Sequence, residues 1–374
     1  MATSRLPRLT WASRALSVDD ACESKVWDSL VDSAVAPDVY YRPGYVRACG
    51  GIGHGKAVGV LVETGAARAL FPLLLRPLNT LSFAPNEPGF DAASPYGYGG
   101  LLLLDNGRTI AGNQASELLG GLRDWCMENQ VVAAHIRLHP VLHQANWFAG
   151  ALGKGLHLHQ AGPTIAIDLR HWHTETASIA TLDKGRRSDL IYARRRLRLT
   201  WASEGTTLEG DLQSFRALYE ARMTELGAGD YYHFPTEYYR LLAEGLGSRL
   251  DIAIAWLNDS PVGAALFMAD KVMAHYHLSA TNDLGRNNKA TTLIINAAAE
   301  RVRSQGCERL HLGGGADGED KLFAFKRSFG GDLYRYSHLS LICDPLRYGK
   351  LVERRLTASD LPALRSNYFP EYRA

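Results

Sequence analysis

One stretch of about 65 residues, from 250 to 314, constrains the fold most strongly. Three strand-like runs, LDIAIAWLN, SPVGAALFMAD and KVMAHYHLSA, follow one another with short turns between them. A fourth run, RLHLGGG, comes only after the helix-like segment ATTLIINAAAERVRS at 290–304, which ends at Gly306. Short turns join antiparallel strands, whereas a strand–helix–strand connection brings the chain back parallel. The sequence therefore predicts mostly antiparallel strands followed by a parallel crossover, in an α+β (mixed α/β) fold.

The first 165 residues also alternate between strand-like and helix-like segments. Apolar runs at 56–63 and 67–78, separated by TGA, predict a hairpin, and 112–130 has helical spacing of its leucines. Further strands are predicted at 101–104, in VAAHIRLHPVL and in GPTIAIDL. In the second half of the chain, further helices are predicted at 210–229 and 235–246. Each half thus has strands around a central helix, which indicates that the two halves share an architecture.

Length and composition agree with an ordinary globular protein of two domains. The chain has 374 residues, of which 46% are hydrophobic and 21% charged. We predict a first domain at 1–170, a second at 171–345 and a C-terminal tail at 346–374. Five scattered cysteines indicate reduced thiols, the N-terminus lacks the apolar segment of a secretory signal, and the apolar run at 101–104 is too short to span a membrane. A cytoplasmic protein is the expectation.

Six glycines surround one short helix in the block HLGGGADGEDKLFAFKRSFGG at 311–331. Glycine concentrates where the backbone turns tightly or approaches a ligand closely. The helix carries Lys321, Lys326 and Arg327. The block is therefore either a linking loop or a site where cations face an anion or a carbonyl group.

A strongly basic helix is predicted within 181–201. Its seven Lys and Arg residues are opposed locally only by Asp183 and Asp189. With a net charge of only +2 for the whole chain, a polyanion would have to bind to such a local patch. Phosphate binding is the functional interpretation, and a solvated helix face is the structural one.

The segment SPYGYGG at 94–100 alternates tyrosines with glycines. Aromatic rings with hydroxyl groups and exposed backbone amides suit a ligand of mixed polarity. A tight aromatic loop that only packs against the core explains the same composition.

Several common active sites are not indicated. His135, His139 and His143 are four residues apart, but Pro140 breaks the helix that would align them. The histidine pairs at 157/159 and 171/173 lack a cysteine or carboxylate at fixed spacing, so no metal is expected. The chain also lacks a nucleophile elbow, a P-loop and a dinucleotide-binding glycine motif. Hydride transfer and nucleotide hydrolysis are therefore disfavoured.

Five blocks, in this order, resemble the FemABX-like branch of the GNAT acyltransferase superfamily, over about residues 35 to 345. They are VYYRPGYVRACG (39–50), SPYGYGG (94–100), KGRRSDLIYARRRLRL (184–199), AHYHLSATN (274–282) and LHLGGG…DKLFAFKRSFGG (310–331). The resemblance implies two tandem GNAT-like subdomains with a cleft between them. It also implies transfer of an amino acid from aminoacyl-tRNA to an amine, without a covalent nucleophile or a cofactor. The acceptor would be a peptidoglycan precursor or a peptide or other amine of secondary metabolism.

The same resemblance assigns roles to individual residues. Phe325 and Lys326 correspond to the family's acyl-transfer centre, where the ammonium would stabilise the negative charge that forms on the reacting carbonyl oxygen. Candidate substrate-binding residues are Tyr96, Gly97, Tyr98, Tyr276, His277, Asn282, Gly313 and Gly314. Candidate residues for tRNA or phosphate binding are Lys184, Arg186, Arg187, Arg194, Arg195 and Arg196.

Two departures from the family pattern keep alternatives open. No heptad run indicates the coiled-coil arm of the cell-wall members. The segment LGRNNKATTL at 284–293 offers Arg286 and Lys289 but lacks the glycines of a CoA pyrophosphate loop, which disfavours acyl-CoA as the donor. A CoA-dependent N-acyltransferase remains the alternative enzyme, and a non-catalytic pair of GNAT domains the alternative from another class.

Overall fold

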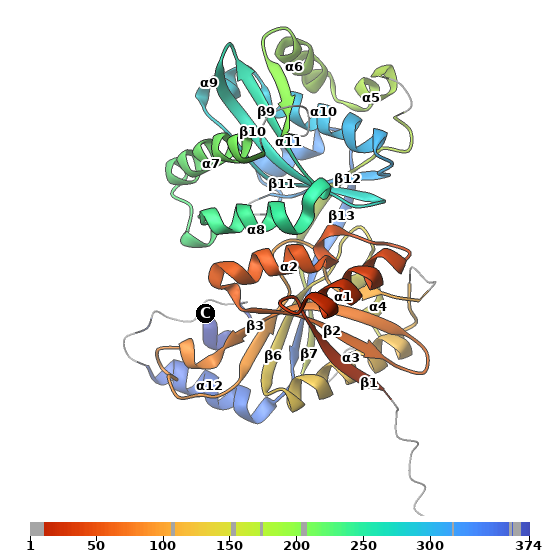
Figure 1. Ribbon diagram of the computed structural model, residues 1–374, viewed down its shortest axis with the longest axis vertical. Coiled ribbons are helices and arrows are strands. Elements are labelled where there is room, and N and C mark those ends of the chain that lie inside the picture. Colours follow the sequence, from red (N-terminus) through yellow and green to blue (C-terminus); the bar gives the residue numbers. More distant parts are fainter. Residues whose placement is uncertain are drawn as a thin grey trace, which may run out of the picture. The chain divides into compact units, whose positions relative to one another are not determined.

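The computed structural model describes residues 11–105, 109–150, 155–172, 175–202, 208–315, 318–358, 361 and 368–374. The chain forms two compact units (Figure 1). The first consists of Met1–Ala161 and Tyr336–Ala374, and the second of Gly162–Arg335. The first unit is therefore discontinuous in sequence, and the second is one uninterrupted segment.

The sheet of the first unit has the strand order β1-β2-β3-β4-β6-β13. These strands are β1 (Ala12–Ser17), β2 (Lys56–Glu63), β3 (Arg68–Pro77), β4 (Phe90–Ala93), β6 (Val131–Arg137) and β13 (Asp332–Ile342), and the two-residue β5 (Leu102–Leu103) pairs with β3. Strands β1 to β4 are antiparallel neighbours, β4 and β6 are parallel, and β13 runs antiparallel to β6. The predicted hairpin is confirmed as β2 and β3.

Helices cover both faces of this sheet. Its helices are α1 (Ala21–Ser33), α2 (Pro43–Cys49), α3 (Gly112–Glu128), α4 (Gln144–Phe148) and α12 (Pro345–Thr357). Alternate residues of β3, such as Phe71 and Leu73, share a buried core with Leu118 and Leu122 of α3. On the other face the backbone of Gly59 lies against the ring of Trp27 in α1. The helix α12 adds a smaller core around Tyr348 and Leu351.

The sheet of the second unit has the order β7-β12-β11-β10-β9-β8. Its strands are β7 (Leu156–Asp168), β8 (Arg198–Trp201), β9 (Leu250–Leu257), β10 (Ser260–Ala269), β11 (Met273–Thr281) and β12 (Arg309–Gly314). Strands β8 to β11 are antiparallel, β11 and β12 are parallel, and β7 runs antiparallel to β12. The predicted meander followed by a parallel crossover is confirmed, and so is the mixed α/β class.

The crossover helix α10 (Ala290–Ser304) packs on one face of this sheet, where the main core of the unit lies. The helices α7 (Leu208–Glu225) and α8 (Thr236–Leu246) enclose a separate aromatic cluster around Phe215, Tyr219 and Tyr239. The unit also contains α5 (Glu175–Thr181), α6 (Lys184–Arg194), α9 (Asp283–Asn287) and α11 (Lys321–Arg327).

The two sheets have the same plan, and in each the strand beyond the parallel pair is not the next strand along the chain. In both, four antiparallel strands are followed by a parallel crossover around one helix, α3 or α10. The strand β7 follows β6 in sequence but pairs with β12 of the second unit. The strand β13 follows β12 but pairs with β6 of the first unit.

This exchange explains where the unit boundaries differ from the sequence-based divisions at 170 and 345. The chain changes units within β7 and again within β13, at 161/162 and 335/336. Residues 346–374, predicted to be a tail, contribute Tyr348 and Tyr372 to a core with Val132 of β6. A sequence pattern detects strands but not which partner completes each sheet.

Among the described residues, no helix is both long and apolar enough to cross a bilayer.

Candidate functional site

Lys326 is a buried cation within the second unit. Its side chain lies on α11, only 9% of the residue is exposed, and its Nζ donates a hydrogen bond of 2.7 Å to the carbonyl oxygen of Gly314. The Nζ also lies 6.0 Å from the centre of the Tyr276 ring. Burial lowers the pKa of Lys326 to about 8, and the charge of Asp320 opposes that shift. The lysine is thus held between β11 and β12 with a pKa close to neutrality.

The strands on either side of this lysine pair over only a short length. The parallel ladder of β11 and β12 joins three residue pairs and ends at His275 and His311. Beyond this point β11 continues to Thr281 and β12 to Gly314, each paired with its other neighbour. The two strands are therefore no longer paired with each other where Tyr276 and Gly314 approach Lys326.

The glycines of the 311–331 block allow this arrangement. Gly313 has a φ of +73° and lies at an irregularity in the pairing of β12 with β7. A Cβ on Gly314 would be 2.7 Å from the backbone oxygen of Pro163, so that position has no room for a side chain. At the other end of α11, a Cβ on Gly330 would overlap the backbone of Thr181. The predicted role of the glycines as places of close backbone approach fits this geometry.

The short helix α11 begins at a residue that the sequence did not single out as functional. Asp320 accepts a hydrogen bond of 2.8 Å from the backbone N of Phe323 and so caps the helix. The same carboxylate is the neighbouring charge that favours protonated Lys326. The position of Asp320, one residue before the helix, is a capping signal that the sequence alone shows. Its proximity to the ammonium of Lys326 depends on the fold.

Phe325 and Arg186 form one contact beside this site. The guanidinium carbon of Arg186 lies 5.0 Å from the centre of the Phe325 ring. Arg186 also donates to Thr292 of α10 at 3.0 Å and pairs with Asp189 at 2.9 Å. Arg186, predicted to bind phosphate, therefore joins α6 to α10 and α11.

The candidate residues on β11 and α9 have clear internal partners. The hydroxyl of Tyr276 donates to Ser279, and burial raises the pKa of Tyr276 to about 12. Burial lowers the pKa of His277 to about 3, and its Nε2 is hydrogen-bonded to the hydroxyl oxygen of Tyr238 at 2.7 Å. Asn282 caps α9 by accepting from the backbone N of Gly285.

The basic segment is confirmed as a helix with an exposed cationic end. Lys184, Arg187, Arg195 and Arg196 are exposed. Arg194 forms an ion pair of 3.2 Å with Glu300, and Arg196 lies 3.9 Å from the centre of the Tyr192 ring. The predicted cluster thus contains outward-facing cations and two arginines, Arg186 and Arg194, that bind other parts of the unit.

In the first unit, the loop 94–100 packs within a cluster of tyrosines. Gly97 has a φ of +96°, and a Cβ there would overlap the ring of Tyr40. The ring of Tyr98 lies 4.7 Å from that of Tyr336 and 6.3 Å from that of Tyr40. Tyr96 is half-buried, and its carbonyl oxygen accepts from the hydroxyl of Tyr45 at 2.7 Å. The loop is therefore packed against the neighbouring tyrosines, and both of its own tyrosines remain partly exposed.

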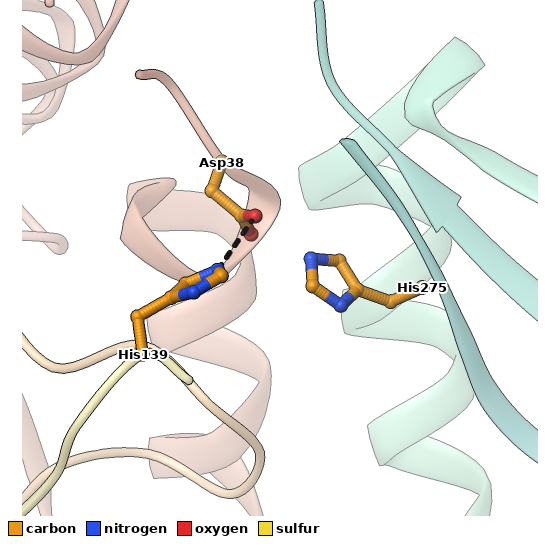
Figure 2. A group of neighbouring side chains, drawn as sticks. All are labelled: Asp38, His139 and His275. Carbon is orange, nitrogen blue, oxygen red and sulfur yellow. Dashed lines mark hydrogen bonds and ion pairs between the residues drawn. The ribbon is translucent and has the colours of Figure 1, made fainter. Parts of the chain in front are cut away.

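A buried aspartate–histidine pair near this loop was missed by sequence reasoning. Figure 2 shows Asp38 and His139, whose Oδ2 and Nε2 are 3.3 Å apart. Because Nδ1 of His139 accepts from the backbone N of Leu142, the proton lies on Nε2, which donates to Asp38. His275, also drawn in Figure 2, belongs to the second unit. Asp38 and His139 are 101 positions apart, so no local motif could reveal their pairing.

Among the histidines considered for a metal, His173 lies outside the described residues.

Known proteins resemble this chain in one sequence segment and in overall fold. Residues 183–327 match the family described as the acetyltransferase (GNAT) domain. A crystal structure of FemX is similar with a TM-score of 0.66 and 13% identity, over 87% of this chain and 98% of FemX. No curated protein sequence matches the chain significantly.

Two further structures come from another named group of proteins. The C-terminal domain (DUF2156) of a putative lysylphosphatidylglycerol synthetase from Agrobacterium fabrum has a TM-score of 0.54 and 12% identity, over 89% of this chain and 95% of that domain. L-PGS from Bacillus licheniformis has a TM-score of 0.51 and 10% identity, over 89% and 96% of the two chains. At these identities the likeness shows the fold. The chain thus has a FemX-like fold, residues 183–327 of its second unit match the acetyltransferase (GNAT) domain, and the predicted resemblance to the FemABX-like branch is confirmed at the level of the fold.

Proposed function

We propose that this chain is an aminoacyltransferase that moves an aminoacyl group from aminoacyl-tRNA to an amine acceptor and so forms an amide bond. The observation that carries the proposal is the buried ammonium of Lys326 at the point where β11 and β12 separate. The fold that the chain shares with FemX and with a putative lysylphosphatidylglycerol synthetase supports the proposal.

The chemistry depends on where charge forms during the reaction. Attack of the amine on the ester carbonyl puts negative charge on the carbonyl oxygen, and collapse of this intermediate releases the tRNA 3′-terminal alcohol. A fixed cation in a site shielded from water stabilises that oxygen more than the neutral ester, and so lowers the barrier. Lys326 meets this requirement, because its ammonium is held by Gly314 and its pKa of about 8 leaves it mostly protonated at neutral pH. The remaining acceleration would come from holding amine and ester together.

The donor is the part of the proposal on which the two enzyme hypotheses differ. Arg286, the best candidate for a CoA phosphate, is bound by Asp283 and by Glu225, the latter at 3.1 Å. A cation already held by two carboxylates offers less to a phosphate. The exposed cations of α6 and of the turn after it fit an RNA backbone, which binds through several phosphates in a row.

An acyl-CoA donor is the second candidate, and one observation favours it. The sequence of residues 183–327 matches an acetyltransferase domain, and that segment contains both the crossover helix α10 and Lys326. Transfer from a thioester would use the same ammonium at the same carbonyl oxygen.

A salt titration of donor affinity separates the two donors. Binding of a mixed aminoacyl-tRNA pool and of acetyl-CoA would be measured with the unaltered chain, with Arg187→Gln/Arg195→Gln/Arg196→Gln, and with Arg286→Ala. For a tRNA donor, the log–log slope should flatten in the triple variant by about two units, since each phosphate contact contributes about 0.7 to 0.9. A second triple variant, Arg14→Gln/Lys25→Gln/Lys56→Gln, removes the same charge from exposed positions of the first unit and should leave the slope nearly unchanged.

The opposite pattern identifies the alternative. If acetyl-CoA binds, if its affinity collapses in Arg286→Ala, and if the triple α6 variant behaves as the unaltered chain, the tRNA donor is wrong. A transfer assay with the preferred donor and a mixture of amines then tests amide formation directly, with a reaction that lacks the protein as the blank.

A further inference from the structure

Polar side chains line up across four neighbouring strands of the first unit. In the strand register, Arg76 of β3 is opposite Asp91 of β4, and Ala93 of β4 is opposite His135 of β6. His135 is in turn opposite Ser340 of β13. Paired residues, and residues two apart on a strand, lie on the same face of a sheet. We call this set the polar strip: Arg76, Asp91, His135, Arg137, His338 and Ser340.

Four of these side chains have a buried polar atom that makes no hydrogen bond to the described part of the chain. The atoms are Nη2 of Arg76, Nδ1 of His135, Nε2 of His338 and Oγ of Ser340. Buried polar atoms in folded proteins nearly always have a partner, and each one without a partner calls for an explanation such as a bound ion or water. The two imidazole rings lie 4.7 Å apart, and the strand register puts Ser340 opposite His135 and Arg76 on the same face of the sheet.

The strip also has an excess of positive charge. Asp91 is fully buried and pairs with two guanidiniums, those of Arg76, at 2.5 Å, and of Arg373. One carboxylate therefore serves two cations, and Arg137 adds a third guanidinium, whose Nη1 donates to the Ser94 carbonyl oxygen at 2.9 Å.

The two histidines respond to this charge. Burial, together with Arg137, His338, Arg76 and His159, lowers the pKa of His135 to about 2. Burial, Arg137 and His159 lower the pKa of His338 to about 4. Every charged neighbour that shifts these two pKa values is a base, so the potential at the strip is positive.

We propose that the polar strip is a binding site for a small anionic group, a carboxylate or a phosphate, held by Arg76, His135, His338 and Ser340. An anion would accept hydrogen bonds from the guanidinium, the hydroxyl and the imidazole N–H groups and would offset the excess charge. His135, Arg137 and His338 are each half-buried, so the strip is reachable from solvent.

The strip is continuous with the tyrosine loop. The ring of Tyr336 lies 4.7 Å from that of His338 and 4.7 Å from that of Tyr98. If the loop 94–100 binds the amine acceptor, a point that rests on the proposed function, the anion is an acidic group of that acceptor. The anion site itself does not depend on the proposed function.

Binding at the strip takes up protons. A bound anion favours the protonated imidazoles, so affinity increases as the pH falls. Several groups from the surrounding elements face the two rings. On the strands they are Arg76 of β3, Asp91 of β4, Arg137 of β6, His159 of β7, and Tyr336 and Ser340 of β13. The C-terminal segment adds Phe369 and Arg373, and His54 lies beside Arg76 and Arg137.

The test is calorimetric titration of the full chain with inorganic phosphate and, separately, with sodium acetate, between about pH 6 and about pH 8. Variants His135→Leu and His338→Leu remove one ring each, and His171→Leu removes an exposed histidine of the second unit as the control. Histidine ring NMR resonances of the unaltered chain, followed with and without phosphate, give a second readout that needs no variant.

We expect one of the two anions to bind, each strip variant to weaken it about tenfold, and the control to bind as the unaltered chain does. The anion should also raise the pKa of both strip histidines. Preference for phosphate indicates a phosphate ester as ligand, and preference for acetate a carboxylate. Absence of heat and of ring shifts with both anions, or unchanged affinity in both strip variants, would overturn the proposal. No acyl donor is used, so the result does not depend on the proposed reaction.

Discussion

The two units share a strand order but differ in the segment that comes after the second strand of the parallel pair. In the second unit that segment carries Lys326, a cation in a site from which water is largely excluded. In the first unit the segment after β6 carries His139, whose Nε2 is bound to the carboxylate of Asp38. A fixed cation is one way to stabilise a forming oxyanion, whereas shape and hydrogen bonds hold a substrate. This difference fits the proposed function, in which the second unit would carry out the chemical step and the first would bind the acceptor.

The largest effect should come from removing the charge that distinguishes the second unit. Lys326→Met retains the length and apolar stem of the side chain, and turnover should fall about 100-fold or more, because an oxyanion donor is lost. Lys321→Met, an exposed lysine on the same helix, is the matched control and should leave turnover unchanged. Steady-state kinetics check both variants.

The stability of the same variant provides a second criterion. The folded pKa of Lys326 is lower than its unfolded value of 10.5, so burial of the charged form destabilises the fold below about pH 8, and stability recovers as the pH rises from there toward 10.5. Lys326→Met should therefore unfold at an equal or higher temperature at neutral pH. Near-normal turnover in a folded Lys326→Met protein would remove the proposed distinction between the units.

The next largest effect should be on the stability of the first unit, measured as the free energy of unfolding. Gly97→Ala places a methyl group in the ring of Tyr40 and a side chain at a φ of +96°, which should cost about 2 kcal/mol of the free energy of unfolding. Gly99→Ala in the same loop meets Tyr40 only at 3.3 Å and should cost less. Denaturant unfolding compares them, and equal stability of the two variants would show that the loop is not held by Tyr40.

A pH profile sharpens the assignment of Lys326 to charge stabilisation. If the ammonium is required, turnover should fall about tenfold per pH unit as the pH rises above about 8, because the neutral amine replaces it. A general base would give the opposite slope, with turnover increasing up to about pH 8. The Lys326→Met protein should lose this limb of the profile.

The smallest effect should come from the hydroxyl groups of the loop. Tyr96→Phe and Tyr98→Phe keep both rings and should raise the Michaelis constant of the acceptor about threefold to tenfold, as expected for one lost hydrogen bond each. Donor affinity, measured in parallel, should stay the same. A lower melting temperature with an unchanged Michaelis constant would mean that the tyrosines serve packing alone.

Local patterns predicted most of the strands and helices of the second unit, because its meander, its crossover helix and its glycine block are each contiguous. They also placed Lys326 and Phe325 on one short helix beside the glycines. The strand order of the first unit was less accessible: β4 has four residues within a long loop, and the last strand lies about 200 residues after β6. Pairs such as Asp38 with His139 and Asp91 with Arg373 are contacts across the fold, and neither periodicity nor spacing reports them.

The exchange of β7 and β13 bears on how the chain acquires its structure during synthesis. The ribosome delivers the first unit's β1 to β6 early, but that sheet lacks β13 and the cover of α12 until the last residues have emerged. The second unit, Gly162–Arg335, is contiguous and has all its strands sooner. Domains usually fold in the order in which they are made. Here the unit that begins first is completed last, so its exposed β6 edge has to be shielded from other chains while translation continues.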